Sequence, residues 1–294
     1  MRRLSSPGLA FPGSPGPATP LRRARAVLTS ATIAIVLAAA AASPAAAAHR
    51  VTSTVTGNDI SWPQCGKTFP SGQAFGIVGV NGGLANKVNP CLGPDNGGVS
   101  TSELAWAWGS TGASKLPWKV ALYVNTADPS PLVADWPKSN VVPGIGPCDG
   151  SDSPECAWQY GWERATQDMA WLSAAATQVG VTGKASDYPW WLDVETANSW
   201  ETGSLGLANN VADLQGMVAA FEGAGATVGI YSTSYQWGVI TGGSTDGNLA
   251  GLADWIPGAR TLSAAQANCS LAGFTGAVTI TQWFGKPFDG DWAC

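Results

Sequence analysis

Histidine is almost absent from this chain: His49 is the only one among 294 residues. Catalysis by a Ser-His-Asp or Cys-His arrangement requires a histidine base, and zinc sites most often use histidine as a ligand. His49 also lies beside an expected processing site. The sequence therefore excludes most hydrolase mechanisms and leaves carboxylate chemistry, with 20 Asp and Glu available, as the main candidate.

Charged residues are also scarce, at 12% of the chain, and the basic ones are unevenly distributed. Residues 1–48 contain five of the 15 Lys and Arg and none of the 20 Asp and Glu, so the remainder carries a formal net charge of −10. A nucleic-acid partner requires a basic surface that neutralises phosphates. The acidic balance therefore excludes nucleic-acid binding.

Residues 1–48 have the composition of an export signal. Arginines within 22–25 precede a run of small and apolar residues, 26–42, and the alanines of 45–48 offer a cleavage site before His49. The apolar run is shorter than the roughly 20 residues of a membrane span. We therefore expect a cleaved secretory signal and a secreted or cell-wall-associated mature chain without stable membrane insertion. A retained membrane anchor and twin-arginine export are the alternatives.

All six cysteines follow the expected cleavage site. An even number of cysteines in an exported protein predicts a set of disulfides. Pairs of sequence neighbours are favoured because each closes a short segment, whereas the alternative, a zinc site, lacks any C-x-x-C pair. The favoured pairs are Cys65–Cys91, Cys148–Cys156 and Cys269–Cys294.

Strand-like and helix-like segments alternate along the mature chain, which predicts one β/α domain over 49–294. Two apolar stripes with helical spacing, over 162–179 and 207–221, predict helices that end near Gly180 and Gly223. The predicted strands are 59–62, 74–80, 119–125, 190–195, 227–232, 277–283 and, with a weaker pattern, 252–256.

Polar side chains stand near the carboxyl ends of six of these apolar segments. In a parallel barrel those ends meet on one face, where active sites are built. Strands also become polar where they simply meet solvent, but six strands that end this way favour a shared site. The residues are Asp59, Asn81, Asn125, Asp193, Glu195, Tyr231 and Gln282.

The Asp193-Val194-Glu195 segment is the sharpest local signal. Residues i and i+2 of a strand point to the same face, about 6.5–7 Å apart, so both carboxylates can enter the barrel mouth. Like charges this close, beside Trp190 and Trp191, should raise one pKa and leave the other group ionised. Cleavage of a glycosidic bond requires such a pair of carboxyl groups. Two solvated acids at a strand end remain the simpler interpretation of this segment alone.

Several short motifs occur in an order that resembles the glycoside hydrolase family 25 muramidases. The resemblance is closer still to a set of secreted bacterial proteins whose domain is called glycoside-hydrolase-like, and it covers nearly all of 57–294. The motifs are GNDISWPQ at 57–64, WWLDVE at 190–195, GIYST at 229–233 followed by Trp237, Trp255 in an A-x-W strand, ITQWFG at 280–285 and the late Asp289-Gly290-Asp291.

The resemblance implies an irregular TIM-like β/α barrel with fewer helices than strands, and cleavage between N-acetylmuramic acid and N-acetylglucosamine in peptidoglycan. It implies Glu195 as the proton donor and Asp193 as the carboxylate that assists the reaction. The substrate's own acetamido group assists in this family, so no enzyme nucleophile is assigned. The other matched positions are Asp59 on the first strand, Tyr231 along the substrate groove, and Asp291, ahead of Asp289, near the barrel mouth.

Tryptophan is abundant, with 15 residues, all of them after residue 48. Indole rings stack on sugars, but they also bury much area in cores, which is the simpler role for most of them. The candidates for sugar contact are those next to the predicted strand ends: Trp62, Trp191, Trp237 and Trp283.

Two functions from different classes remain open. The first is a secreted glycosidase that acts on peptidoglycan as a monomer, and the second is a carbohydrate-binding or cell-surface module that keeps the barrel without turnover. Several converging acids favour the enzyme. A third possible function, binding of a small cation at the acidic end of the barrel, has no further support in the sequence. No cofactor and no metal are expected, because Asp289 and Asp291 are too few acids for calcium.

Overall fold

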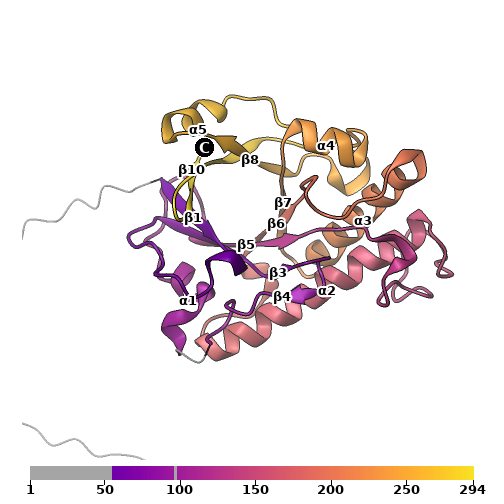
Figure 1. Cartoon of the computed structure of the whole chain (residues 1–294), viewed down its shortest axis with the longest axis horizontal. Coiled ribbons are helices and arrows are strands. Elements are labelled where there is room, and N and C mark those ends of the chain that lie inside the picture. The colour runs from indigo at the N-terminus through magenta and orange to yellow at the C-terminus, as the bar shows by residue number, and fades with distance from the viewer. Residues whose placement is uncertain (1–54, 96–97) are drawn as a thin grey trace, which may run out of the picture. The chain divides into compact units, whose positions relative to one another are not determined.

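The computed structural model describes residues 55–95 and 98–294, which belong to one unit that extends over Val51–Cys294. Eight strands of this unit close into a barrel (Figure 1). Their order is β1-β10-β9-β8-β7-β6-β5-β2, and all neighbours are parallel except β10, which runs antiparallel to β1 and β9. The strands are β1 (Thr56–Ile60), β2 (Phe75–Gly79), β5 (Val120–Asn125), β6 (Pro189–Asp193), β7 (Thr227–Tyr231), β8 (Ala253–Ala259), β9 (Val278–Trp283) and β10 (Asp289–Ala293).

Helices are fewer than barrel strands within the described ranges, and the prediction of an irregular β/α barrel is confirmed. A small hairpin of two further strands follows β2. The helices are α1 (Glu103–Trp108), α2 (Pro154–Val179), α3 (Gly203–Gly223), α4 (Ser234–Thr241) and α5 (Leu262–Asn268), and the hairpin is β3 (Asn81–Gly82) with β4 (Lys87–Val88).

Side-chain alternation along the strands builds two separate apolar regions. On β6, Trp191 belongs to the cluster inside the barrel, whereas Trp190 belongs to the cluster between the barrel and the helices. Trp190 stacks on Phe221 of α3, with ring centroids 4.4 Å apart. Asp193 follows Trp191 by two residues and therefore continues the interior face toward the open end of the barrel.

All seven predicted strands are present, with shifted boundaries. The largest shift is in the first strand, which lies earlier than 59–62 and ends at Ile60, so that Trp62 begins a short 3-10 helix. Strand β10 was not predicted, because its Asp-Gly-Asp sequence has low strand propensity. Pairing with β1 on one side and β9 on the other stabilises this strand, and it closes the barrel.

The two predicted apolar stripes lie on α2 and α3, which run side by side (Figure 1). Helix α2 ends where Gly180 adopts a φ of 78°, a left-handed conformation that favours glycine. Gly161 on α2 and Gly216 on α3 allow the two helices to approach closely, because a β-carbon at either position would overlap the backbone of the other helix.

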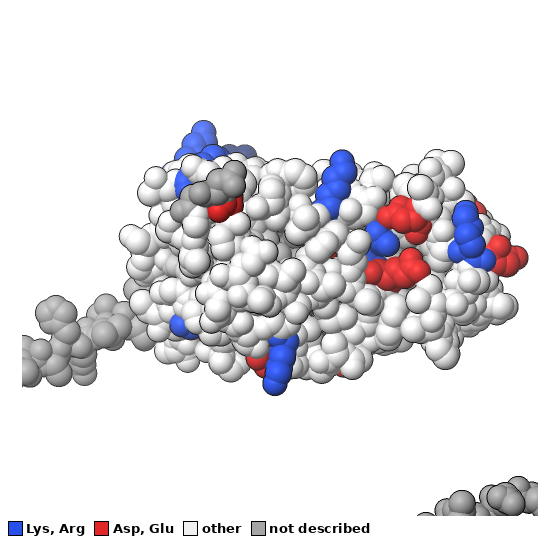
Figure 2. All heavy atoms as spheres, turned by 90° about the horizontal axis from the view of Figure 1, so that it is seen from below, with Lys and Arg blue, Asp and Glu red and all other residues white. Residues whose placement is uncertain are grey.

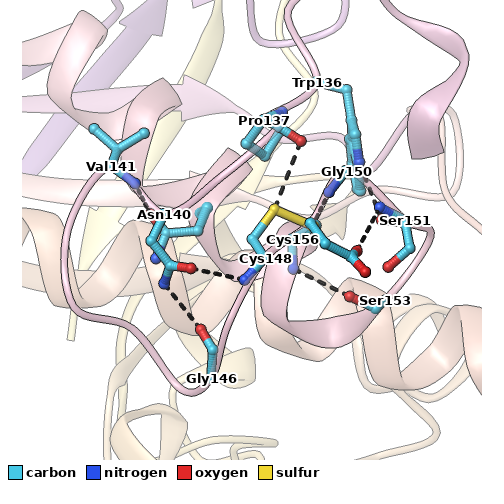
Figure 3. Close-up of a disulfide and its surroundings, with 12 residues drawn as sticks. Trp136, Pro137, Asn140, Val141, Gly146, Cys148, Gly150, Ser151, Ser153 and Cys156 are labelled. Atoms are coloured by element: carbon cyan, nitrogen blue, oxygen red, sulfur yellow. Dashed lines mark hydrogen bonds between the residues drawn. A yellow bond between two sulfur atoms is a disulfide. The ribbon is translucent and has the colours of Figure 1, made fainter.

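The disulfides join Cys65 to Cys91, Cys148 to Cys156 and Cys269 to Cys294, so the prediction of neighbour pairs is confirmed. Figure 3 shows the second of them, which ties the loop before α2 to the first turn of that helix. In this loop the Asn140 side chain accepts a hydrogen bond from the Cys148 backbone N–H at 2.7 Å and donates one to the Gly146 carbonyl at 2.9 Å. The disulfide and the asparagine together hold a segment that has no regular secondary structure.

We expect removal of the Cys148–Cys156 disulfide, by alanine at both positions, to lower the free energy of unfolding by about 2–4 kcal/mol. The cross-link restricts the unfolded chain, and both cysteines are buried, at 6% and 0% exposed. Denaturant unfolding of the variant and of the oxidised wild type measures the difference. An unchanged midpoint would contradict the prediction.

The surface of the described residues is poor in charge. Figure 2 shows one face on which Lys, Arg, Asp and Glu side chains occupy a few places among large uncharged areas. In residues 55–95 and 98–294, no helix combines the length and the apolar character needed to cross a bilayer. The predicted leader over 1–48, the cleavage before His49 and the domain start at 49 lie outside the described residues and stay predictions.

Candidate active site

The carboxyl ends of the parallel strands surround a cavity of about 200 Å³ at one end of the barrel. Five of the seven strand-end residues predicted to share a site line this cavity, which we call the mouth. They are Asp59, Asp193, Glu195, Tyr231 and Gln282.

Asp193 and Glu195 lie at the end of β6, and hydrogen bonds to their backbone carbonyls hold them there. The carbonyl of Asp193 accepts hydrogen bonds from Thr126 Oγ1 at 2.6 Å and Asn198 Nδ2 at 3.0 Å. The carbonyl of Glu195 accepts one from Trp200 Nε1 at 2.9 Å. These bonds leave both carboxyl groups available to the mouth.

Burial raises the pKa of Asp193 well above its ordinary value, and the neighbouring charges of Glu195 and Asp59 raise it further. The Oδ1 atom of Asp193 is buried without a hydrogen-bond partner, which agrees with a group that is costly to ionise. The raised pKa therefore lies on Asp193, whereas the resemblance implies Glu195 as the proton donor. Asp193 retains its proton at a higher pH than an ordinary carboxyl group does.

A chain of hydrogen bonds crosses the mouth opposite this pair. The Tyr231 hydroxyl donates to Gln282 Oε1 at 2.9 Å, and Gln282 Nε2 donates to Asp59 Oδ2 at 2.9 Å. Burial raises the pKa of Asp59 to about 6, and the charge of Asp289 contributes to this rise. The chain fixes the orientation of three side chains that come from different strands.

Of the two late aspartates that the resemblance offers for the barrel mouth, the second choice lines it. Asp289 lines the mouth, where its Oδ1 accepts a hydrogen bond from the Gly285 N–H at 2.8 Å. Asp291, the first choice for the position near the mouth, is 0% exposed and lies beneath the mouth. Burial and the charge of Asp59 raise its pKa well above the ordinary value. Strand β10 explains the difference, because residues two apart share a face but occupy successive layers of the barrel.

A second cavity, of about 400 Å³, continues the mouth and shares Tyr123 and Asp193 with it. Asn81, Asn125 and Trp62 line this cavity. The Asn81 side chain is 4% exposed and accepts a hydrogen bond from the Asn125 N–H at 2.6 Å, so it positions Asn125. Trp62 is 42% exposed and leaves a ring face available to a ligand.

Trp191, Trp237 and Trp283, which were also predicted to contact sugar, line neither of the two cavities. Trp191 is 3% exposed inside the barrel, one layer below Asp193, and Trp237 is 2% exposed on α4. Trp283 follows Gln282 directly, so alternation turns it away from the mouth, and it packs over Gly290 of β10. Of the four candidate tryptophans, Trp62 alone lines either cavity.

Several residues of the mouth were not predicted as site residues. Tyr123, Ser61 and Trp255 line it together with Asp289. Tyr123 lies two residues before Asn125 on the same strand face, so the alternation that selected Asn125 could also have selected Tyr123. Trp255 packs edge-on against Tyr231, with ring centroids 4.5 Å apart, and supports its orientation.

The raised pKa of Asp59 predicts that stability falls as the pH rises. In the folded state the pKa of Asp59 is about 6, against 3.8 for an ordinary aspartate, so the folded protein holds this proton to a higher pH. The stabilisation that the proton gives is therefore present below about pH 4 and is lost as the pH passes 6. Asp59→Asn lacks this loss, so we expect its free energy of unfolding, relative to that of wild type, to rise by about 2–3 kcal/mol from pH 4 to pH 7.5. Denaturant unfolding at both pH values measures this change. The control is Asp246→Asn, at an exposed position, which should leave the pH dependence of stability unchanged. If stability of Asp59→Asn fell with pH as steeply as that of wild type, the prediction would be wrong.

The fold and this mouth define a class of protein: a disulfide-stapled β/α barrel with paired carboxyl groups at the carboxyl ends of its strands. No group of three His, Cys, Asp or Glu in the described part of the chain is arranged to hold a metal ion. A family model described as lysozyme-like protein 1 matches residues 178–253, a segment that contains β6, β7 and the Asp193–Glu195 pair.

The chain is similar to a protein named probable GH family 25 lysozyme 2 from Dictyostelium discoideum, with 38% identity over 58 residues. That match spans 20% of this chain and about a quarter, 26%, of the relative. Two muramidases of known structure cover 82% of this chain and 94% of their own. The one from Trichobolus zukalii has 19% identity and a TM-score of 0.45, and the one from Acremonium alcalophilum has 16% identity and a TM-score of 0.46.

Proposed function

We propose that this protein is a glycoside hydrolase that cleaves the glycan strands of peptidoglycan, as an N-acetylmuramidase. The observation that carries the proposal is the Asp193–Glu195 pair in a mouth that Asp59 and Tyr231 also line. The match of a lysozyme-like family model to the segment that contains the pair supports it.

The chemistry requires a proton for the leaving oxygen and a negative charge beside the sugar ring that becomes positive in the transition state. We assign the proton to Glu195, which lies beyond the last residue of β6 and therefore nearer to the opening. Asp193 lies one layer deeper, where its carboxyl group orients the substrate's acetamido group and, in its ionised form, stabilises the developing positive charge. Asp59, held by Gln282, adds a further carboxyl group on the opposite side of the mouth.

The aromatic and amide groups of the second cavity extend the binding surface beyond the scissile bond. Trp62 offers a ring face for stacking on a sugar, and Asn125 Nδ2 donates to the Gly83 carbonyl at 2.7 Å, which holds this amide at the rim. A polymer bound along both cavities would present one glycosidic bond to Glu195.

We further propose that the mature chain acts outside the cytoplasm. Three disulfides support an oxidising compartment, and the net charge of −10 after residue 48 supports a partner other than nucleic acid. The expected secretion, monomeric state and lack of membrane insertion stay predictions, which fractionation of the producing cells and light scattering would test.

The direct test is release of reducing ends from purified peptidoglycan by the oxidised mature chain. Borohydride reduction of the products followed by hydrolysis and sugar analysis identifies the new end. Reduced muramic acid supports an N-acetylmuramidase, whereas reduced glucosamine would change the assigned linkage. Binding to the polymer without any release would reject the enzyme and support a carbohydrate-binding module on the same barrel.

A further inference from the structure

A third cavity, of about 720 Å³, adjoins the cavity that continues the mouth, and the two share Asn198. Its lining comes from the connection between β5 and α2, the connection between β6 and α3, and Leu84 of the β3–β4 hairpin. We call it the acidic cavity because three of its lining residues are Asp128, Asp152 and Glu201. The mechanism proposed above uses none of these acids.

The acids of this cavity have no basic partner. In residues 55–95 and 98–294, neither ion pair of the structure involves them, and no Lys, Arg or His lines the cavity. Asn209 of α3 joins two of them, since its Nδ2 donates to Asp152 Oδ1 at 2.8 Å and to Glu201 Oε2 at 3.1 Å. The cluster is therefore held together by an amide, and no cation stands among its lining residues.

Two oxygen atoms of lining residues have no hydrogen-bond donor. Asp128 is 1% exposed, and among the described residues neither its Oδ2 atom nor Oε1 of Glu201 has a hydrogen-bond partner. Burial raises the pKa of Asp128 to about 7, with a contribution from the charge of Asp152. A buried acceptor that lines a cavity and lacks a donor favours a ligand that brings N–H groups and positive charge.

The remaining lining fits an organic cation. Trp200 lines the cavity, and indole rings attract ammonium groups through their π face. A primary ammonium group has three N–H donors, which can satisfy several acceptors on different walls. The Trp200 Nε1–H also bonds the Glu195 carbonyl, so one short segment positions this wall relative to the mouth.

We infer that the acidic cavity binds a primary ammonium group carried by the glycan polymer, while the polymer itself lies in the mouth. This inference rests on the proposed function, and it adds a substrate preference for strands with free amines. Two sources share this chemistry: a diamino acid in a peptide attached to the glycan, and an amino sugar without its acetyl group.

The test compares soluble ligands that differ in their amines. The first is the disaccharide-peptide released from peptidoglycan, with a free side-chain amine on its peptide, and the second is the same molecule after acetylation of that amine. A peptide-free chito-oligosaccharide, fully or partly deacetylated, examines the amino-sugar source. Calorimetry with the wild-type protein should give an affinity about 10–100-fold higher for at least one amine-bearing ligand than for its acetylated form.

Asp128→Asn with Glu201→Gln should abolish that preference, because both changes retain shape and remove charge. Glu201→Gln alone, at a partly exposed position, provides a second variant should the double variant unfold. The matched control is Asp246→Asn with Glu222→Gln, which removes two exposed acids elsewhere and should keep the preference.

Equal wild-type affinity for every amine and its acetylated form would overturn the inference. The outcome is independent of turnover. Hydrolysis of peptidoglycan without an amine preference would support the proposed function and reject the amine site. An amine preference without hydrolysis would support the amine site and reject the proposed function.

Discussion

Replacement of Glu195 by Gln should lower the rate of reducing-end release by about 10²–10⁴-fold, because the amide keeps the shape of the side chain but has no proton to transfer. Asp193→Asn should also lower the rate, since the neutral amide cannot stabilise a positive charge on the sugar. The assay uses purified peptidoglycan and the mature chain. Asp246→Asn, an exposed acid away from the mouth, is the control and should retain full activity.

The two variants also separate the roles of the pair. The raised pKa lies on Asp193, for which burial is the main cause. If Glu195→Gln keeps full activity while Asp193→Asn has none, the proton donor is Asp193 and our assignment is reversed. The pH dependence of the wild type should have two limbs whose apparent pKa values belong to the coupled carboxyl groups and not to single residues.

Replacement of Trp191 by Ala should destabilise the fold by about 3–5 kcal/mol. The ring is 3% exposed, packs edge-on against Trp255 with centroids 5.9 Å apart, and lies over Gly229, where a β-carbon would overlap it. Its removal leaves a cavity in the barrel that the surrounding strands cannot close. Denaturant unfolding measures the loss.

Trp62→Ala is the matched comparison, because this ring is 42% exposed. We expect it to weaken binding of an oligosaccharide and to leave the unfolding midpoint nearly unchanged. If Trp191→Ala also left the midpoint unchanged, Trp191 would not be a core residue and our account of the barrel interior would be wrong.

The sequence permitted the acid pair to be found because strand geometry is local. Residues two apart on one strand share a face in any sheet, so Asp193 and Glu195 could be assigned to one side without knowledge of the neighbouring strands. The same reasoning placed Asp59, Tyr231 and Gln282 at strand ends that meet in the mouth. Sequence separation was also sufficient to favour the three disulfides between neighbouring cysteines.

Local reasoning could not decide which face of a strand is inside. Gln282 and Trp283 are adjacent and both were predicted to contact substrate, but alternation allows one of them to face the mouth, and pairing with β10 turns Trp283 over Gly290. The closing strand itself was not visible in the sequence. Its stability comes from hydrogen bonds to β1 and β9, which are remote from one another along the chain.

The sequence by itself determined the class of fold, the disulfide pairs and the identity of the paired acids, because periodicity and spacing express these features within short segments. Only the tertiary structure decided the depth of each acid, with Asp289 in the mouth and Asp291 beneath it. It alone brought Asp128 and Asp152, from the connection between β5 and α2, together with Glu201, from the connection between β6 and α3. Burial and contact between distant segments depend on how the barrel closes, and no short stretch of sequence contains that information.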